Sequence, residues 1–286
     1  TGIDAFDAWV GELSTTGYLH NHARMWFASI WIFTLRLPWE LGTALFLEHL
    51  LDGDAASNTL SWRWVAGLQT KGKTYLARAD NIRTYTGDRF DPSGLAADAP
   101  ALTGPEPPPV RPLVPRPHAR TLVADGGNTG LLLHEDDLHP ESLGLAIPIR
   151  TVFACPTRHA HGPDPVAPPV AAWIAAALAD GVARAEAAFD VPAAPIDTAP
   201  VADAAWIAAV VDWTRREGLA RVVTAEAPVG PVADRLAGLD TALSARGVPL
   251  IRVRRAYDQM LWPEATKGFF PFKEKIPALL RRLDLG

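Results

Sequence analysis

A proline-rich stretch near the middle of the chain most constrains how it can fold. Four of the five residues from position 105 to 109 are proline, in a region rich in proline, alanine and glycine. Proline fixes φ and removes a hydrogen-bond donor, so this segment can form neither a helix interior nor a central strand. We therefore predict a semi-rigid linker over residues 96–118, separating residues 1–95 from residues 119–286.

The first part of the chain has a helical pattern. Apolar side chains recur at helical spacing from Ile3 to Leu13, and we expect further helices over residues 22–35, 39–51 and 55–65. The residues that follow are polar and irregular. We expect them to wrap the end of this helical part.

The second part alternates short apolar runs with amphipathic segments, a pattern typical of a parallel sheet with crossover helices. Strands are expected over residues 121–124, 131–133, 147–154, 222–224 and 250–253, and helices over residues 170–189, 204–217 and 231–246. The DGGNTG segment at 125–130 matches neither standard phosphate-loop spacing and is interpreted as a turn.

Composition restricts the protein's class and compartment. The formal net charge of −5 neither supports nor excludes a local DNA-binding groove. No apolar run reaches membrane-spanning length and no leader segment opens the chain, so we expect a cytoplasmic protein without a membrane partner. Cys155 is the single cysteine, which excludes a disulfide framework or a cysteine-ligated cluster within the chain.

Two motifs and a tryptophan carry the most functional information. Residues 16–25 read TGYLHNHARM, residues 50–64 read LLDGDAASNTLSWRW, and Trp39 lies between them. Asp-Gly-Asp alone is a common turn and helix start. A calcium loop counted from Asp52 is excluded, because no glutamate stands at its twelfth position.

Together these residues resemble the flavin-binding domain of the DNA photolyase and cryptochrome family. The spacing of that family's TGW, HN-x-x-RM, DGD-x-A-x-N and W-x-W elements is matched without a gap from Thr1 to Trp64. The resemblance implies a bound FAD, and pyrimidine dimers in damaged DNA as the partner. It also places a phosphate-binding stretch before Thr1, so we expect a fragment or a processed chain.

The resemblance assigns the cofactor-binding residues. Arg24 and Asp52 correspond to a buried ion pair beside the flavin ring, whose disruption would cost about 3 to 5 kcal/mol. Asp54 corresponds to the group that binds the imide edge of the ring, and Asn58 to the residue opposite the flavin N5. The remaining predicted cofactor-binding residues are Asn21 and Gly53.

It likewise assigns residues to electron transfer and to the substrate. Trp62 and Trp39 correspond to the first two members of the tryptophan chain that reduces the photoexcited flavin, packed nearly edge to face. Its third member is expected before Thr1. The residues corresponding to the wall that receives the flipped lesion and to the neighbouring contacts are Tyr18, Asn21, His22, Met25 and Trp64.

Departures from the family pattern leave the activity open. The family's NGGWQW is NTLSWRW here, His22 replaces the usual arginine, and PYFRIFNP is replaced by TYLARADNI, which retains Tyr75 and Asn81. The first hypothesis is a blue-light-driven photolyase that splits pyrimidine dimers. The alternatives are a cryptochrome-like photoreceptor without repair, and a degenerate member that binds no flavin.

The second part also resembles a photolyase element, the nucleotide-fold domain that usually comes first in the chain. The segments GLLLHEDDLHPESL, VFACPTR, LARVVTAEAPVG and KGFFPFKEKI carry this resemblance. The predicted fold class is therefore an α-helical FAD-binding part followed by a Rossmann-like α/β parallel-sheet domain, with the domain order inverted. No residue pattern identifies an antenna chromophore or a protein partner.

The remaining histidines do not favour a metal site. His159 and His161 lie in a turn rich in proline and glycine, without a carboxylate or cysteine cluster around them, which favours a solvated loop. His118, His134 and His139 are isolated in the sequence.

Overall fold

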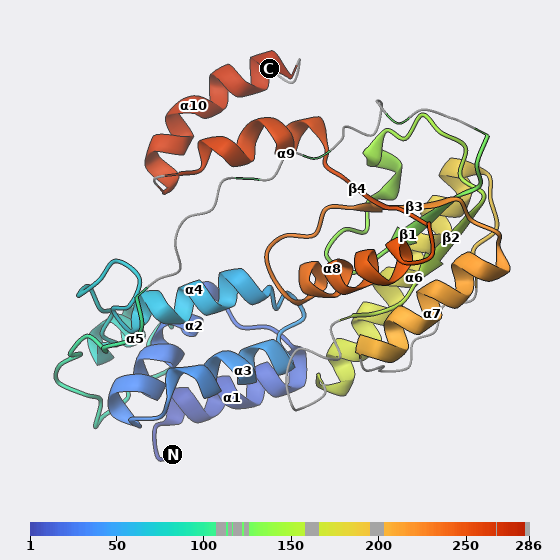
Figure 1. Ribbon diagram of the computed structural model, residues 1–286. Helices are drawn as coiled ribbons and strands as arrows, with labels where there is room; N and C mark the ends of the chain where they lie inside the picture. Colours follow the sequence, from blue (N-terminus) through green and yellow to red (C-terminus); the bar gives the residue numbers. More distant parts are fainter. Residues whose placement is uncertain are drawn as a thin grey trace. The chain divides into compact units, whose positions relative to one another are not determined.

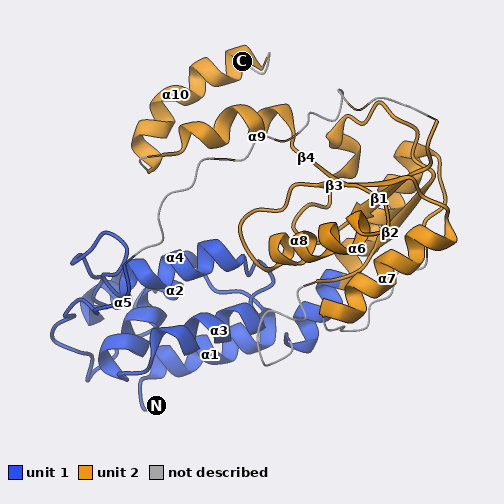
Figure 2. Cartoon of the chain, in the orientation of Figure 1, with its two compact units in different colours: residues 1–107, 158–174 blue, residues 108–157, 175–286 orange. Residues whose placement is uncertain are grey.

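A computed structural model describes residues 1–106, 113, 116, 122, 126–157, 166–194, 203–266 and 268–283 of the chain, which divides into two units. Unit 1 contains residues 1–107 and 158–174, and unit 2 contains residues 108–157 and 175–286 (Figure 2). The division at 107 falls within the predicted linker, most of whose proline cluster lies outside the described residues. The domain bounds stay a prediction.

Unit 1 is built from helices, as its sequence pattern predicts. In chain order they are α1 (Asp4–Thr16), α2 (Asn21–Ser29), the π-helix η1 (Ile30–Thr34), α3 (Trp39–His49), α4 (Ala55–Val65) and α5 (Ala79–Tyr85) (Figure 1). The helix expected over residues 22–35 is thus an α-helix that passes into a π-turn. Helix α5 lies in the segment expected to be irregular, and its Ile82 is fully buried.

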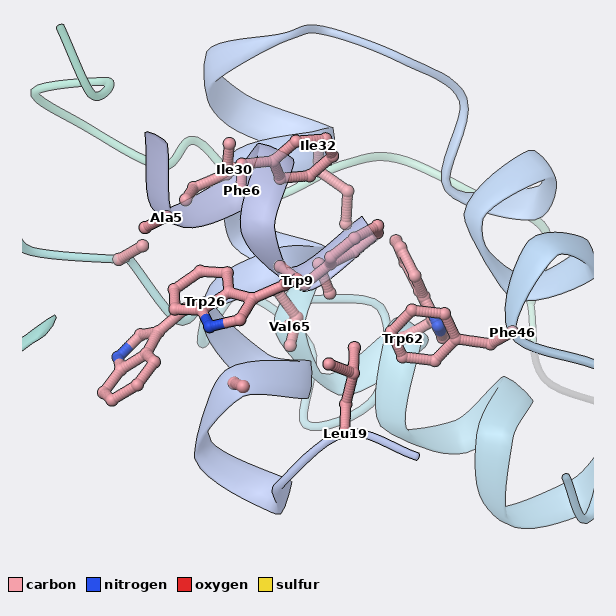
Figure 3. Packing of buried hydrophobic residues seen from close by; sticks show 14 of the residues in the cluster. Ala5, Phe6, Trp9, Leu19, Trp26, Ile30, Ile32, Phe46, Trp62 and Val65 are labelled. Carbon is pink, nitrogen blue, oxygen red and sulfur yellow. The ribbon is translucent and has the colours of Figure 1, made fainter. Parts of the chain in front are cut away.

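Aromatic side chains dominate the core of unit 1. Trp9 and Trp26 stack with ring centroids 5.6 Å apart, and Trp62 meets Phe46 edge-on at 5.1 Å (Figure 3). Offset and edge-on ring pairs contribute about 0.5 to 1.5 kcal/mol each beyond the area they bury. This core fixes α1 to α4 around the two sequence motifs.

Unit 2 contains a four-stranded parallel sheet with strand order β2-β1-β3-β4. Its strands are β1 (Thr129–Leu133), β2 (Thr151–Ala154), β3 (Arg221–Ala225) and β4 (Leu250–Val253) (Figure 1). Its longer helices are α7 (Asp203–Arg216), α8 (Pro231–Ser244) and the part of α6 (Pro168–Phe189) from residue 175 onward. The α/β pattern predicted from the sequence is confirmed. The described C-terminal residues form α9 (Ala256–Leu261), the short 3-10 helix η5 (Trp262–Glu264) and α10 (Phe269–Arg282).

Some strand bounds differ from expectation. Strand β2 begins at Thr151 rather than at Ile147, since Pro148 cannot donate to a ladder. The strand expected over residues 121–124 lies outside the described residues apart from Leu122, which is irregular. The last two residues of DGGNTG belong to β1, where a side chain at Gly130 would meet Trp213 at 2.4 Å.

Candidate cofactor site in unit 1

The two sequence motifs lie side by side because of one glycine. Gly17 ends α1 with φ 67°, a conformation that favours glycine. Its carbonyl accepts a hydrogen bond from the amide of Leu51 at 3.0 Å. A Cβ at Gly17 would lie 2.7 Å from Cγ of Leu51. The loop that begins the first motif therefore packs directly against the turn of the second.

Arg24 connects the same two segments. Its Nη2 donates to both carboxylate oxygens of Asp52 at 3.0 and 3.1 Å, and its Nε donates to the carbonyl of Leu19 at 2.8 Å. The guanidinium also lies 5.8 Å from the ring centroid of Tyr18. The predicted Arg24–Asp52 pair is thus present.

The expected burial of this pair is wrong. The side chain of Asp52 is 59% exposed and that of Arg24 is 24% exposed. Asp52 lies in a surface turn, where its carboxylate keeps contact with solvent. The stability contribution falls accordingly to about 0 to 1 kcal/mol, the range of exposed ion pairs.

A cavity of about 460 Å³ opens between these segments, within the range of about 300 to 1,000 Å³ that holds small molecules. Nine predicted site residues line it, namely Asn21, Arg24, Met25, Asp52, Gly53, Asp54, Asn58, Trp62 and Trp64. Tyr18, His22 and Trp39 are not among its lining residues in the part of unit 1 that the structure describes. Most of the assigned residues thus share one cavity.

The acidic turn also begins a helix at the cavity. Asp54 is the N-cap of α4, and its Oδ1 accepts a hydrogen bond from the amide of Ser57 at 2.5 Å. Ser57 lines the cavity as well. The positive end of the α4 dipole therefore lies at the cavity wall, where it favours a negatively charged ligand group. Asp54 combines this capping role with its position in the cavity lining.

Asn58 is held in one orientation within the cavity wall. It is 8% exposed, and its Nδ2 donates to the carbonyl of Thr43 at 2.9 Å. Because the amide nitrogen is used by the protein, the amide oxygen is the atom that can accept a hydrogen bond from a ligand. A ligand N–H group suits this position.

Trp62 lies deeper in the wall and is 2% exposed. Its indole occupies space left by Gly42 of α3, where a Cβ would lie 2.2 Å from the ring. Phe27 and Trp31 meet the indole edge-on with ring centroids 6.4 and 6.1 Å away. Its Nε1 is buried without a hydrogen-bond partner, and a polar ligand atom in the cavity would suit such a donor.

Trp39 differs from its expected arrangement. The guanidinium of Arg63 lies 5.7 Å from the centroid of the Trp39 ring. Among the described residues, the indole in edge-on ring contact with Trp62 is Trp31, and Trp39 is not one of its ring partners. The expected edge-to-face contact between Trp39 and Trp62 is therefore wrong.

The predicted lesion-wall residues divide into two groups. Trp64 lines the cavity and lies 5.7 Å from Tyr75 between ring centroids. Burial raises the pKa of the Tyr75 phenol, and a hydrogen bond with Trp26 partly offsets that effect. His22 instead stacks on Trp26 at 5.4 Å, on the side of α2 that faces Tyr85.

Several residues of the site escaped prediction. Gly42 leaves room for Trp62 because it has no side chain, and Thr43 contributes its backbone carbonyl. Trp31 is one member of a continuous apolar run, so nothing in the sequence marks it out. An exposed serine at position 61 lines the cavity one helical turn from Ser57. The spacing of Ser57, Asn58 and Ser61 along α4 is the signal that could have indicated this face.

Unit 2 has polar pairs at the carboxyl ends of its strands. Glu135 accepts hydrogen bonds at 2.8 Å from both the amide and the hydroxyl of Thr157. Arg255 binds both carboxylate oxygens of Asp137. Burial acts to raise the pKa of Asp137, but the hydrogen bonds and charge of Arg255 outweigh it and hold this pKa below its usual value. These contacts stabilise the loops after β1 and β2.

The described histidines give no metal site. His134 is buried, and its Nε2 lies 3.1 Å from the carbonyl of Ala225. In the described ranges no group of three or more histidine, cysteine, aspartate or glutamate residues could hold a metal ion. His118, His159 and His161 lie outside those ranges. No described helix is long and apolar enough to cross a membrane.

Comparison with known proteins assigns unit 1 to a class. A cavity lined by an arginine, acidic groups, an amide and indoles defines a candidate flavin-binding helical domain. Residues 1–96 match the sequence profile of the FAD binding domain of DNA photolyase. This segment of the chain therefore belongs to the DNA photolyase and cryptochrome family.

Individual relatives from the same family match about a third of the chain. Deoxyribodipyrimidine photo-lyase from Streptomyces griseus is 37% identical over 35% of this chain and 25% of its own length. The Escherichia coli K12 enzyme of that name is 37% identical over 33% of this chain and 20% of its own length. Cryptochrome-1 of Arabidopsis thaliana is 36% identical over 33% of this chain and 14% of its own length.

The matches are partial in both directions. The chain covers a quarter or less of the length of these three relatives, and the family profile covers residues 1–96. The search of solved structures gave no significant match.

Proposed function

We propose that unit 1 binds FAD in its cavity, and that the chain is part of a blue-light-driven, photolyase-like DNA repair protein. The observation that carries this proposal is the convergence of nine family-motif residues on one cavity of about 460 Å³. Reduced FAD would supply the electron that splits a pyrimidine dimer. The protein's contribution is to hold that group, orient it and exclude water from it.

The residues of the cavity divide this work. Asn58 would offer its amide oxygen to a flavin N–H group, because its nitrogen donates to the carbonyl of Thr43. Arg24 and the N-terminus of α4 favour negative charge on the ring. Asp54 and Asp52 accept hydrogen bonds from ligand N–H or O–H groups, while Asn21 and Gly53 complete the wall.

The substrate side of the cavity has partly exposed apolar and aromatic surface. Met25 and Trp64 line the cavity, and Trp64 is 38% exposed. An exposed aromatic ring is what a flipped base stacks on. Tyr18 is linked to the cavity through Arg24, whose guanidinium lies 5.8 Å from the centroid of the Tyr18 ring. His22 stacks on Trp26, which is not a lining residue of this cavity, so its contact with the lesion stays a prediction.

A light-dependent repair assay tests this proposal. The purified chain, with FAD added and chemically reduced, is mixed with DNA that contains pyrimidine dimers and exposed to blue light. We expect dimers to be lost in the light and retained in the dark. The repair function is rejected if dimers are lost equally in the light and in the dark. It is also rejected if FAD is bound and no dimers are lost in either condition.

A cryptochrome-like photoreceptor is the second candidate. It is favoured by the position of Tyr18 and His22 outside the cavity lining, because a repair site needs its lesion contacts to converge. A Trp62→Phe variant helps to separate the two candidates. If the protein repairs DNA, Trp62→Phe whose flavin has been chemically reduced should still repair pyrimidine dimers. If it is a photoreceptor, the parent protein should show flavin photoreduction, and neither the parent nor Trp62→Phe should repair dimers.

For unit 2 we propose a Rossmann-like nucleotide-fold domain that follows the flavin domain, inverting the usual order. Its parallel sheet with order β2-β1-β3-β4 supports that class. Damaged DNA as partner and a cytoplasmic location also stay predictions. A crystal structure of the complete protein would test the domain order directly.

A further inference from the structure

The electron route to the cavity has a direct structural candidate that lies outside the family motif. Trp62 is the buried indole of the cavity wall, and Trp31 is its edge-on indole partner, with ring centroids 6.1 Å apart and an interplanar angle of 83°. Electron transfer between aromatic side chains depends steeply on their separation. An indole in ring contact with Trp62 therefore has the advantage over one without such contact.

A change of helix type positions Trp31. Helix α2 passes into the π-helix η1, in which the amide of Leu35 bonds the carbonyl of Ile30 at 2.9 Å. Short π-helical turns are rare and occur frequently at functional sites. The Trp31 ring also stacks on Phe27 at 6.0 Å, which holds it against the core next to Trp62.

The electrostatic surroundings also distinguish Trp31 from Trp39. The indole Nε1–H of Trp31 donates to the carbonyl of Pro38 at 2.8 Å, and this carbonyl dipole stabilises positive charge on the ring. Trp39 has the Arg63 guanidinium 5.7 Å from its ring centroid. A fixed positive charge opposes oxidation of that ring.

We propose that Trp31, and not Trp39, is the residue that reduces the oxidised Trp62. This rests on the proposed FAD site. Trp62 gives one electron to the light-excited flavin, Trp31 gives one electron to Trp62, and a thiolate in solution restores Trp31, which is half-buried and so reaches solvent. Two such transfers oxidise two thiolates to one disulfide and deliver two electrons to the flavin, which takes its protons from water.

The test is flavin photoreduction in matched variants. The protein with oxidised FAD bound is illuminated with blue light in the presence of dithiothreitol, and the flavin absorbance and the transient absorption of tryptophan radicals are recorded. We expect Trp31→Phe and Trp62→Phe to slow photoreduction at least ten-fold. Trp39→Phe should stay within two-fold of the parent rate, and so should Trp9→Phe, a control for loss of a buried indole.

The outcomes separate the two proposals. If FAD binds and Trp31→Phe is reduced at the parent rate, or if Trp39→Phe is slowed ten-fold, the Trp31 route is overturned while the FAD site stands. If no FAD binds, both proposals are overturned together.

A second readout needs no flavin. Two indoles in contact give a coupled circular dichroism signal, which is lost when either of them is replaced. The signal lost in Trp31→Phe plus the signal lost in Trp62→Phe should therefore exceed the signal lost in the double variant. Strict additivity of these spectra would show that the indoles are not in contact in solution and would overturn the route. The pair Trp9 and Trp62 is the control and should be additive.

Discussion

The side-chain amide of Asn58 donates a hydrogen bond to the main-chain carbonyl of Thr43 at 2.9 Å. This bond joins α4 to α3 beneath the cavity and fixes which end of the amide faces a ligand. It also means that Asn58 has a structural role in addition to its proposed contact with the flavin. Substitutions at this position should therefore change stability as well as cofactor binding.

Replacing Asn58 with aspartate should destabilise unit 1 near neutral pH by about 1 to 3 kcal/mol, because an ionised carboxylate cannot donate to Thr43 and is buried. Burial raises the pKa of such a group, so its cost is largest above that pKa and shrinks as the carboxyl is protonated at lower pH. Thermal unfolding of Asn58→Asp and the parent at pH 5 and pH 8 measures this. Asn21→Asp, at an exposed position of the same cavity, is the control and should show no such loss.

The packing of Trp62 against Gly42 gives a second prediction. A Cβ at Gly42 would lie 2.2 Å from the indole, so Gly42→Ala should cost about 1 to 3 kcal/mol through overpacking and should weaken FAD binding by displacing Trp62. Gly11→Ala, at an exposed position of α1 with nothing within 4 Å, should instead stabilise by about 0.5 to 1 kcal/mol. Urea unfolding of both variants checks the sign. Equal effects at the two positions would be inconsistent with the close packing at Gly42.

The exposed Arg24–Asp52 pair gives a prediction opposite to that of a buried pair. Since the side chain of Asp52 is 59% exposed, Asp52→Asn should change the free energy of unfolding by no more than about 1 kcal/mol. It should nevertheless weaken FAD binding, because Asp52 and its partner line the cavity. A loss of 3 kcal/mol or more in stability would show that the pair is buried in solution.

The sequence was most informative where function restricts side chains. Nine of the assigned residues line one cavity because the motif preserves both residue type and spacing. The strands of unit 2 were found because their central residues form continuous apolar runs, as buried parallel strands do. The helix expected over residues 55–65 is α4, which follows a common helix start, Asp-Gly-Asp, and has Asp54 as its N-cap.

The features that the sequence did not predict depend on contacts of backbone atoms or on local backbone geometry. The Thr43 carbonyl has no sequence signature, and the π-turn that orients Trp31 is not visible in an apolar run. The exposure of Asp52 depends on how the turn meets solvent rather than on the motif. The edge-on indole partner of Trp62 could not be chosen by spacing, because η1 and α3 each carry a tryptophan, Trp31 and Trp39, that could have packed against it.

Asp137 and Arg255 predict an acid-sensitive contribution to the stability of unit 2. The pKa of Asp137 is lowered from its usual 3.8, so the stabilisation is present above pH 3.8 and is lost as the pH falls through the lower pKa of the folded state. At pH 7, Asp137→Asn should cost up to about 3 to 5 kcal/mol because the largely buried Arg255 loses its charged partner.

Urea unfolding from pH 7 down to pH 3 tests this pair. The difference in the free energy of unfolding between the parent and Asp137→Asn should be constant from pH 7 to pH 5 and should become smaller below pH 3.8. If this difference has already disappeared at pH 5, the pKa of the Asp137 carboxyl is raised, contrary to the hydrogen bonds it accepts.

Binding of FAD by the purified chain tests the central claim most directly. Fluorescence titration of FAD should show saturable binding of one FAD per chain, weakened at least ten-fold by Ser61→Trp, which places an indole in the cavity. Ser14→Trp, on an exposed position of α1, should bind as the parent does. Absence of saturable binding, or equal affinity in Ser61→Trp and the parent, would contradict the assignment of this cavity to FAD.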